Sequence, residues 1–136
     1  MSIRSKGREI AFKVLYAIDV GKNSVADAFL PFKYESPLVL DYALNLVKGT
    51  LSELENIDSE ISSLLKNWEF SRLNVVDKEI LRVAFYEAEH IEDSNLGVLV
   101  YESVELAKKY GDTNSGDFVN GLLRSFLRTK NEESET

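Results

Sequence analysis

The sequence predicts an all-α protein, a compact bundle of about seven helices joined by short loops. Apolar residues recur at steps of three and four along most of the 136 residues, and no useful stretch alternates as a strand would. The only two prolines, Pro31 and Pro37, lie close together, which leaves the rest of the chain free to form long helices. This length is typical of one domain. We expect that domain over residues 1–129 and a disordered polar tail over residues 130–136.

The first helix is predicted over residues 3–20, with a first turn that is frayed. Its apolar side chains fall on one helical face. They are Ile10, Ala11, Val14, Leu15 and Ile18. Gly21 then ends the helix, as a glycine just past the last turn often does. A short helix follows over residues 25–32 and is ended by Pro31.

Residues 38–65 keep the helical period and predict two helices. A break near residues 56–58 is expected because Asn and Asp favour caps over helix interiors. Trp68 and Phe70 follow, and we interpret them as core anchors in a turn.

The next helix has a recognisable start at Asn74, a typical N-cap. Asp77 lies three residues later, where a carboxylate favours the positive helix end. The predicted buried stripe comprises Val76, Ile80, Leu81, Ala84, Phe85 and Ala88.

Two further helices complete the bundle. After a loop over residues 92–97, one opens at Leu99 or Val100 and ends at Gly111, with two lysines in its last turn. The last helix has one broad apolar face. Its members are Phe118, Val119, Leu122, Leu123, Phe126 and Leu127.

The residue types exclude most catalytic chemistry. Without any cysteine there is no thiol catalysis, iron–sulfur cluster or cysteine-based zinc site, and a single histidine, His90, excludes multi-histidine metal sites. Glu102 and Glu105 are an acidic pair that is more typical of an exposed helix face than of acid–base catalysis. We therefore predict no enzyme, no metal and no cofactor. The longest uncharged run is eight residues, so no membrane span is expected, and the cysteine-free composition fits the cytoplasm.

Charge is distributed unevenly along the chain. The net charge is -7, but residues 1–22 carry +3, with Arg4, Lys6 and Arg8 close together. Tyr16 lies off the apolar stripe of the same helix. An exposed tyrosine beside cations is typical of a single-strand RNA site, where bases stack and cations bind phosphates. The alternative is a solvated basic helix face.

Four blocks of residues stand in order along the chain. They are Arg8, Glu9, Ala11, Leu15 and Tyr16; then Arg72, Leu73, Val76, Asp77, residues 80–84, Tyr86 and Glu87; then Glu102 and residues 104–111; and finally Ser115, residues 118–121 and Leu123. In the order and spacing of these blocks the sequence resembles, from about Arg4 to Leu127, the NusB family of bacterial transcription antitermination factors.

The resemblance implies two small helical subbundles packed together and a non-catalytic role. Members bind the single-stranded boxA element of ribosomal RNA leader transcripts as a heterodimer with NusE, a small-subunit ribosomal protein. The pair joins other Nus factors on RNA polymerase to suppress termination and support ribosomal RNA transcription. Some members form homodimers that mask the RNA surface.

The resemblance also implies site residues. The expected RNA-binding set is Arg4, Lys6, Arg8, Tyr16, Asn114, Ser115 and Phe118, and the expected NusE contact is Asp77. The family opening is often a nearly continuous arginine run, which Ser5 and Gly7 interrupt here, so dependence on the partner is expected. The alternative is a protein-interaction module or homodimer without direct RNA contact.

Overall fold

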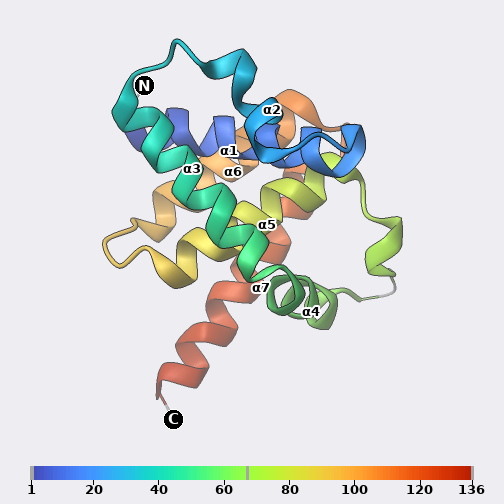
Figure 1. Cartoon of the computed structure of the whole chain (residues 1–136). Coiled ribbons are helices and arrows are strands. Elements are labelled where there is room, and N and C mark those ends of the chain that lie inside the picture. Colours follow the sequence, from blue (N-terminus) through green and yellow to red (C-terminus); the bar gives the residue numbers. More distant parts are fainter. Residues whose placement is uncertain (1, 67, 136) are drawn as a thin grey trace.

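The computed structural model describes residues 2–66 and 68–135, and within them the chain is entirely helical apart from turns and loops (Figure 1). The elements are α1 (Ile3–Gly21), α2 (Val25–Phe29), the 3-10 turn η1 (Leu30–Phe32), α3 (Pro37–Ser52), α4 (Leu54–Leu64), the 3-10 turn η2 (Phe70–Arg72), α5 (Val75–His90), α6 (Leu96–Tyr110) and α7 (Ser115–Glu135). Seven α-helices and no strand in this part confirm the predicted class. None of its helices is both long enough and apolar enough to cross a membrane.

Two hydrophobic cores meet at α5, which runs through the middle of the molecule (Figure 1). One core joins α1, α2 and α3 and receives Val83 from α5. The other joins α4, α5, α6 and α7 and receives Phe12 from α1. Phe85 is fully buried in the second core and stacks on Phe126, with ring centroids 3.9 Å apart. The two cores correspond to the two expected subbundles.

The caps of three helices show how local sequence sets the element boundaries. The Ser2 hydroxyl accepts a hydrogen bond from the Ser5 amide at 3.0 Å, so α1 is regular from its first turn and the expected fraying is wrong. Asn74 caps α5 as predicted, with its side chain accepting from the Val76 amide at 2.8 Å. Asn95 does the same for α6. That cap places the start of α6 at Leu96, earlier than predicted.

The break between α3 and α4 lies at Glu53, not at residues 56–58. Asn56 is instead accommodated in the first turn of α4, where its side-chain amide donates to the Glu53 carboxylate at 2.9 Å. Trp68 was expected in the core but 61% of its surface is exposed. Phe70 is partly buried and packs against the second core. Of the two aromatic residues expected to anchor the core, only Phe70 does so.

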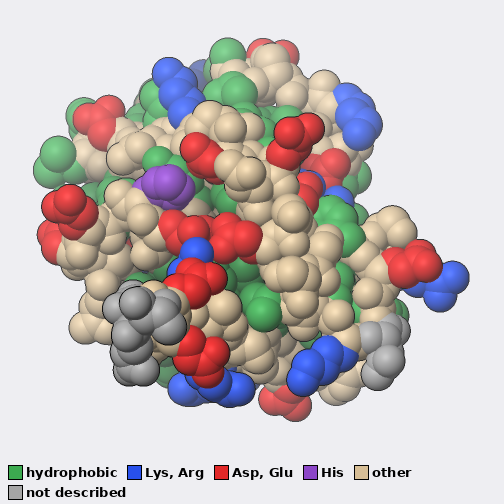
Figure 2. All heavy atoms as spheres, turned by 90° about the horizontal axis from the view of Figure 1, so that it is seen from below, with side chains coloured by type: hydrophobic (Ala, Val, Ile, Leu, Met, Phe, Trp, Pro, Cys, Tyr) green, Lys and Arg blue, Asp and Glu red, His purple; other side chains and the backbone are tan. Residues whose placement is uncertain are grey.

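At the other end of the chain, α7 continues to Glu135, through most of the residues expected to form a disordered tail. Met1 and Thr136, which belong to the predicted domain and tail, lie outside the described residues. Lys130 in this extension pairs with Glu60 at 3.2 Å and Glu89 at 3.1 Å, which ties it to α4 and α5. Figure 2 shows acidic side chains gathered on this lower face near the single histidine.

Candidate nucleic-acid interface

Arg8, one of the cations predicted to face RNA, lies inside the protein with 4% of its surface exposed. Its guanidinium donates to both carboxylate oxygens of Glu87 on α5, at 2.9 and 2.6 Å, and also to Glu102 on α6. Burial acts to lower the pKa of Arg8, but the hydrogen bond and charge of Glu87 outweigh it and the pKa is raised. The positive charge is therefore neutralised within the fold, which departs from the expectation of a phosphate contact.

The other two cations of the opening remain near the surface. Arg4 is partly exposed and pairs with Asp93 at 2.7 Å. Lys6 is exposed and has no ion pair among the described residues. Of the three predicted cations, Lys6 is therefore the one whose charge is fully available to a phosphate.

Gly7, which interrupts the basic run, is buried against α3. A Cβ atom at this position would lie 2.8 Å from Cδ2 of Tyr42 and 3.2 Å from its Cβ. Real Cβ atoms essentially never approach a ring this closely, so a side chain here would require the Tyr42 side chain to shift. Packing between α1 and α3 therefore disfavours an arginine at this point of the opening.

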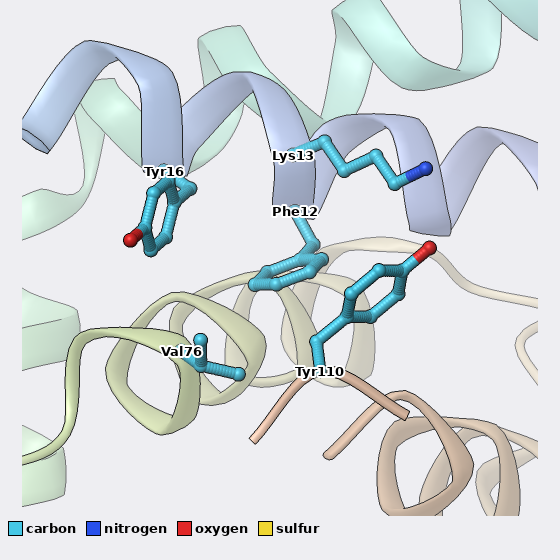
Figure 3. Close-up of a pocket in the computed structure, with 5 residues that line it drawn as sticks. All are labelled: Phe12, Lys13, Tyr16, Val76 and Tyr110. Carbon is cyan, nitrogen blue, oxygen red and sulfur yellow. The ribbon is translucent and has the colours of Figure 1, made fainter. Parts of the chain in front are cut away.

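Tyr16 is 38% exposed and lines a cavity of about 310 Å³ between α1, α5 and the end of α6 (Figure 3). Phe12 and Lys13 of α1, Val76 of α5 and Tyr110 of α6 form the rest of its wall. The Phe12 and Tyr110 rings lie 5.4 Å apart at a tilt of 47°. Phe12 is only 3% exposed, so Tyr16 and the partly exposed Tyr110 provide the aromatic surface, of the kind on which unpaired bases stack.

Tyr110 is held in place at this cavity by its hydroxyl, which donates to Glu9 at 2.5 Å. Lys109 donates to the same carboxylate oxygen at 3.2 Å. Burial opposes ionisation of Glu9, but these two hydrogen bonds lower its pKa below the ordinary value. The ammonium of Lys13 lies 5.2 Å from the centre of the Tyr110 ring. Two cations therefore flank one aromatic ring.

Sequence reasoning singled out Tyr16 but not Lys13, Lys109 or Tyr110, which line or flank the same cavity. Lys13 carried a signal, because it lies three residues before Tyr16 and so on the same helical face. Lys109 and Tyr110 carried no such signal, because lysines in the last turn of α6 are equally typical of an ordinary helix C-terminus.

A second cavity of about 420 Å³ lies around the start of α5. Its wall comprises Trp68, Arg72, Leu73, Asn74, Asp77, Asp112, Asn114 and Phe118. The structure therefore brings together Asn114, Phe118 and Asp77, which the sequence assigned to two different partners. The two cavities share no lining residue; α5 contributes Val76 to the first and Asp77 to the second.

Ser115, an expected RNA contact, and Asp77, the expected NusE contact, are both buried. Ser115 is fully buried, and its hydroxyl accepts from the Asp112 amide at 3.0 Å, so it shapes the turn that begins α7. Asp77 is 6% exposed although it lies in the first turn of α5. The contact of Asp77 with NusE stays a prediction, and it now concerns a side chain that its own chain covers.

Comparison with known proteins identifies the family. The model of the NusB family matches residues 5–128, which is most of the chain. The chain belongs to the NusB family. A transcription antitermination protein NusB from Syntrophomonas wolfei is 41% identical over 137 residues, covering 94% of this chain and 98% of that protein.

Solved NusB structures share the fold. The structure of NusB from T. maritima has a TM-score of 0.82 and 32% identity, covering 92% of this chain and 90% of that one. A structure of NusB and NusE in complex with double-stranded RNA has a TM-score of 0.85 and 28% identity, with 95% and 98% covered. The second of these structures contains NusE, as the resemblance implies, and its RNA is double-stranded, whereas the resemblance implies single-stranded RNA.

Proposed function

We propose that this protein is a non-catalytic transcription antitermination factor that binds boxA-type single-stranded RNA of ribosomal RNA leaders together with NusE. Membership of the NusB family supports the role, and the similarity to a NusB–NusE structure with double-stranded RNA supports NusE and RNA as kinds of partner. Its further partners in the proposal are the other Nus factors and RNA polymerase.

The observation that carries the proposal is the cavity at Tyr16. Tyr16 and Tyr110 provide stacking surface, and Lys13, whose ammonium lies beside the Tyr110 ring, provides phosphate-binding charge. Single-strand binding sites need both. Lys6 adds an exposed cation on the same helix. Arg4, Asn114 and Phe118 remain proposed RNA contacts, whereas buried Arg8 and Ser115 would act by holding the surface in shape.

One specific observation favours the alternative, a protein-interaction module or homodimer without RNA contact. Arg8 and Arg4 are both paired with carboxylates of the same chain, which leaves less free positive charge than the family opening suggests. On this basis NusE is expected to supply part of the RNA affinity.

Fluorescence anisotropy with a labelled boxA-type RNA, measured with and without NusE, distinguishes the RNA-binding factor from the protein-interaction module. The proposal expects saturable binding that strengthens when NusE is present and weakens for Tyr16→Ala in both conditions. Tight association with NusE but no RNA binding in either condition would establish the alternative.

A further inference from the structure

Two arginines on the outward face of α7 have no carboxylate partner among the side chains that the structure describes. Arg124 and Arg128 are both exposed and lie one helical turn apart, so they project from the same face. The Nε atom of Arg124 donates to the side-chain oxygen of Asn120 at 3.0 Å, and no described group contacts the rest of its guanidinium. The charge of both arginines is therefore available to an anion from outside the protein.

Gly121 lies on this same face, one turn before Arg124. A Cβ atom at Gly121 would meet no atom within 4 Å, whereas a Cβ at Gly7 would lie 2.8 Å from a tyrosine ring. Glycine inside a helix is destabilising relative to alanine, and packing within this chain does not require it here. Gly121 instead leaves the backbone of α7 open to close approach by a ligand beside the two arginines.

A groove of about 260 Å³ between α6 and α7, the α6–α7 groove, lies next to Arg124. Apolar side chains of both helices line it together with Tyr101, which is 65% exposed. Arg124 and Lys108 contribute positive charge to its wall, and Glu105 contributes negative charge that pairs with Lys108 at 3.7 Å. The groove therefore combines an exposed aromatic ring with an excess of positive charge.

The α6–α7 groove joins a second groove, of about 280 Å³, between α1 and α6. Tyr101 and Glu105 line both grooves, and the second also contains Ser5 and Arg8 of the basic opening. Each carboxylate in the wall of the second groove is paired with a cation of the same chain. The pairs are Glu9 with Lys109 at 3.2 Å, Glu102 with Arg8, and Glu105 with Lys108. A hollowed surface whose carboxylates are neutralised therefore leads from α1 across α6 to α7.

We propose that the α6–α7 groove and the two arginines of α7 bind a second segment of RNA, the nucleotides that flank the boxA-type element. A base of this segment stacks on Tyr101, and its phosphates contact Arg124 and Arg128. The planar guanidinium group suits phosphate oxygens, and an exposed tyrosine beside cations suits an unpaired base. The proposal rests on the proposed RNA-binding function and extends the bound length of the transcript beyond the surface of α1.

An acidic helix of a partner protein would also match the cations and the apolar wall of this groove. RNA is favoured because the groove shares lining residues with the one at the basic opening. It is also favoured because an exposed tyrosine near a cation repeats the combination of Tyr16 and Lys13 at the first cavity. Contact with a protein is the competing outcome in the test below.

The test measures fluorescence anisotropy of a labelled short boxA-type RNA and of the same RNA extended at its 5′ or 3′ end. The extension is about eight nucleotides, a length typical of one single-strand binding site. In the presence of NusE, extension at one end at least is expected to raise the affinity of wild type about tenfold, within the range for a stacked base. It should also steepen the log–log salt slope by about 1.4, the value for two phosphates on a single strand.

The double variant Arg124→Ala/Arg128→Ala should bind the short RNA like wild type and lose both the gain in affinity and the added salt slope. The matched control is Lys33→Ala/Lys48→Ala, which removes the same charge from exposed positions at the end of η1 and on α3. This control should keep the gain. Tyr101→Ala should weaken binding of the extended RNA about fivefold without changing the salt slope, and Tyr101→Phe should restore it, because a ring remains for stacking.

Several results would overturn the second segment and leave the proposed function intact. They are equal affinity of wild type for the short and extended RNAs, an undiminished gain in the arginine double variant, and equal weakening of both RNAs by that variant. If the double variant keeps the gain and weakens NusE binding, this face of α7 contacts a protein instead. No binding of any of these RNAs by wild type, with or without NusE, would count against the proposed function itself.

Discussion

Arg8 on α1 and Glu87 on α5 form a two-point ion pair that is closed to solvent, with both guanidinium–carboxylate distances below 3 Å. Glu87 is fully buried and also accepts from the Ser94 hydroxyl at 3.2 Å. The pair joins the opening helix to the helix shared by both cores. A residue that belongs to the family's basic opening therefore serves in this chain to fix α1 on the rest of the protein.

The first prediction concerns that pair. Arg8→Ala should lower the free energy of unfolding by about 3–5 kcal/mol, because Glu87 would be left charged and buried without its partner. Lys6→Ala, on the exposed side of the same helix, should change it by less than about 0.5 kcal/mol. Urea unfolding of both variants provides the comparison. An Arg8→Ala variant as stable as wild type would show that the ion pair is not formed in solution.

The second prediction concerns the core. Phe85→Ala should cost about 3–5 kcal/mol, the usual range for removing a large buried ring, because it also removes the stack on Phe126. Tyr34→Ala is the matched control, since that ring is 91% exposed. Thermal and urea unfolding measure both. A loss below about 1 kcal/mol for Phe85→Ala would mean that the ring is not packed as described.

The third prediction separates stacking from charge at the first cavity. Tyr16→Ala should weaken RNA binding by about 1–3 kcal/mol with little change in the salt dependence, because stacking does not release counterions. Lys13→Ala should instead flatten the log–log salt slope by about 0.7, the value for one phosphate contact on a single strand. Anisotropy titrations over a salt series distinguish the two.

The control for that experiment is the thermal stability of the two variants. Melting temperatures of Tyr16→Ala and Lys13→Ala should stay near the wild-type value, since both residues are partly exposed. If Tyr16→Ala unfolds the protein, Tyr16 is a packing residue and the RNA site at this cavity is wrong.

The fourth prediction concerns pH. Burial raises the pKa of Glu79 to about 7, although the charge of Arg82 at 2.5 Å acts against it. The Glu79 carboxyl is therefore still protonated in the folded protein over a pH range in which the same carboxyl of the unfolded chain is ionised. The contribution of Glu79 to the free energy of unfolding should then fall as the pH rises from about 4.5 to 7.

Glu79→Gln removes this titration and should flatten the decline in stability between pH 5 and pH 7. Urea unfolding at several pH values, with Glu55→Gln on the exposed first turn of α4 as control, checks the effect. An identical pH profile for wild type and Glu79→Gln would contradict the raised pKa.

Much of the fold could be predicted from periodicity and caps, because both are local. Asn74 and Gly111 mark helix ends through their own side chain and backbone, and these positions agree with the structure. The break at Glu53 was missed because Asn56, a residue that favours caps, is instead satisfied by a side-chain contact within α4. The exposure of Trp68 was not predicted, because the sequence pattern around a turn does not show whether an apolar side chain is buried or exposed.

The candidate site was harder to predict for a physical reason. Whether a cation is free depends on which carboxylate the fold brings to it, and Glu87 lies 79 residues from Arg8. The burial of Asp77 depends in the same way on the turn before α7. Tyr16 could be predicted because its exposure follows from its place on one helix.

The position of α5 in both hydrophobic cores also bears on how the molecule unfolds. A helix that contributes Val83 to one core and Phe85 to the other cannot leave either without disturbing both. The two subbundles therefore have no independent melting transition available to them. Amide hydrogens in the centre of α5 should exchange only through opening of the whole molecule, which makes this helix the slowest-exchanging element and couples the two halves into a single cooperative unit.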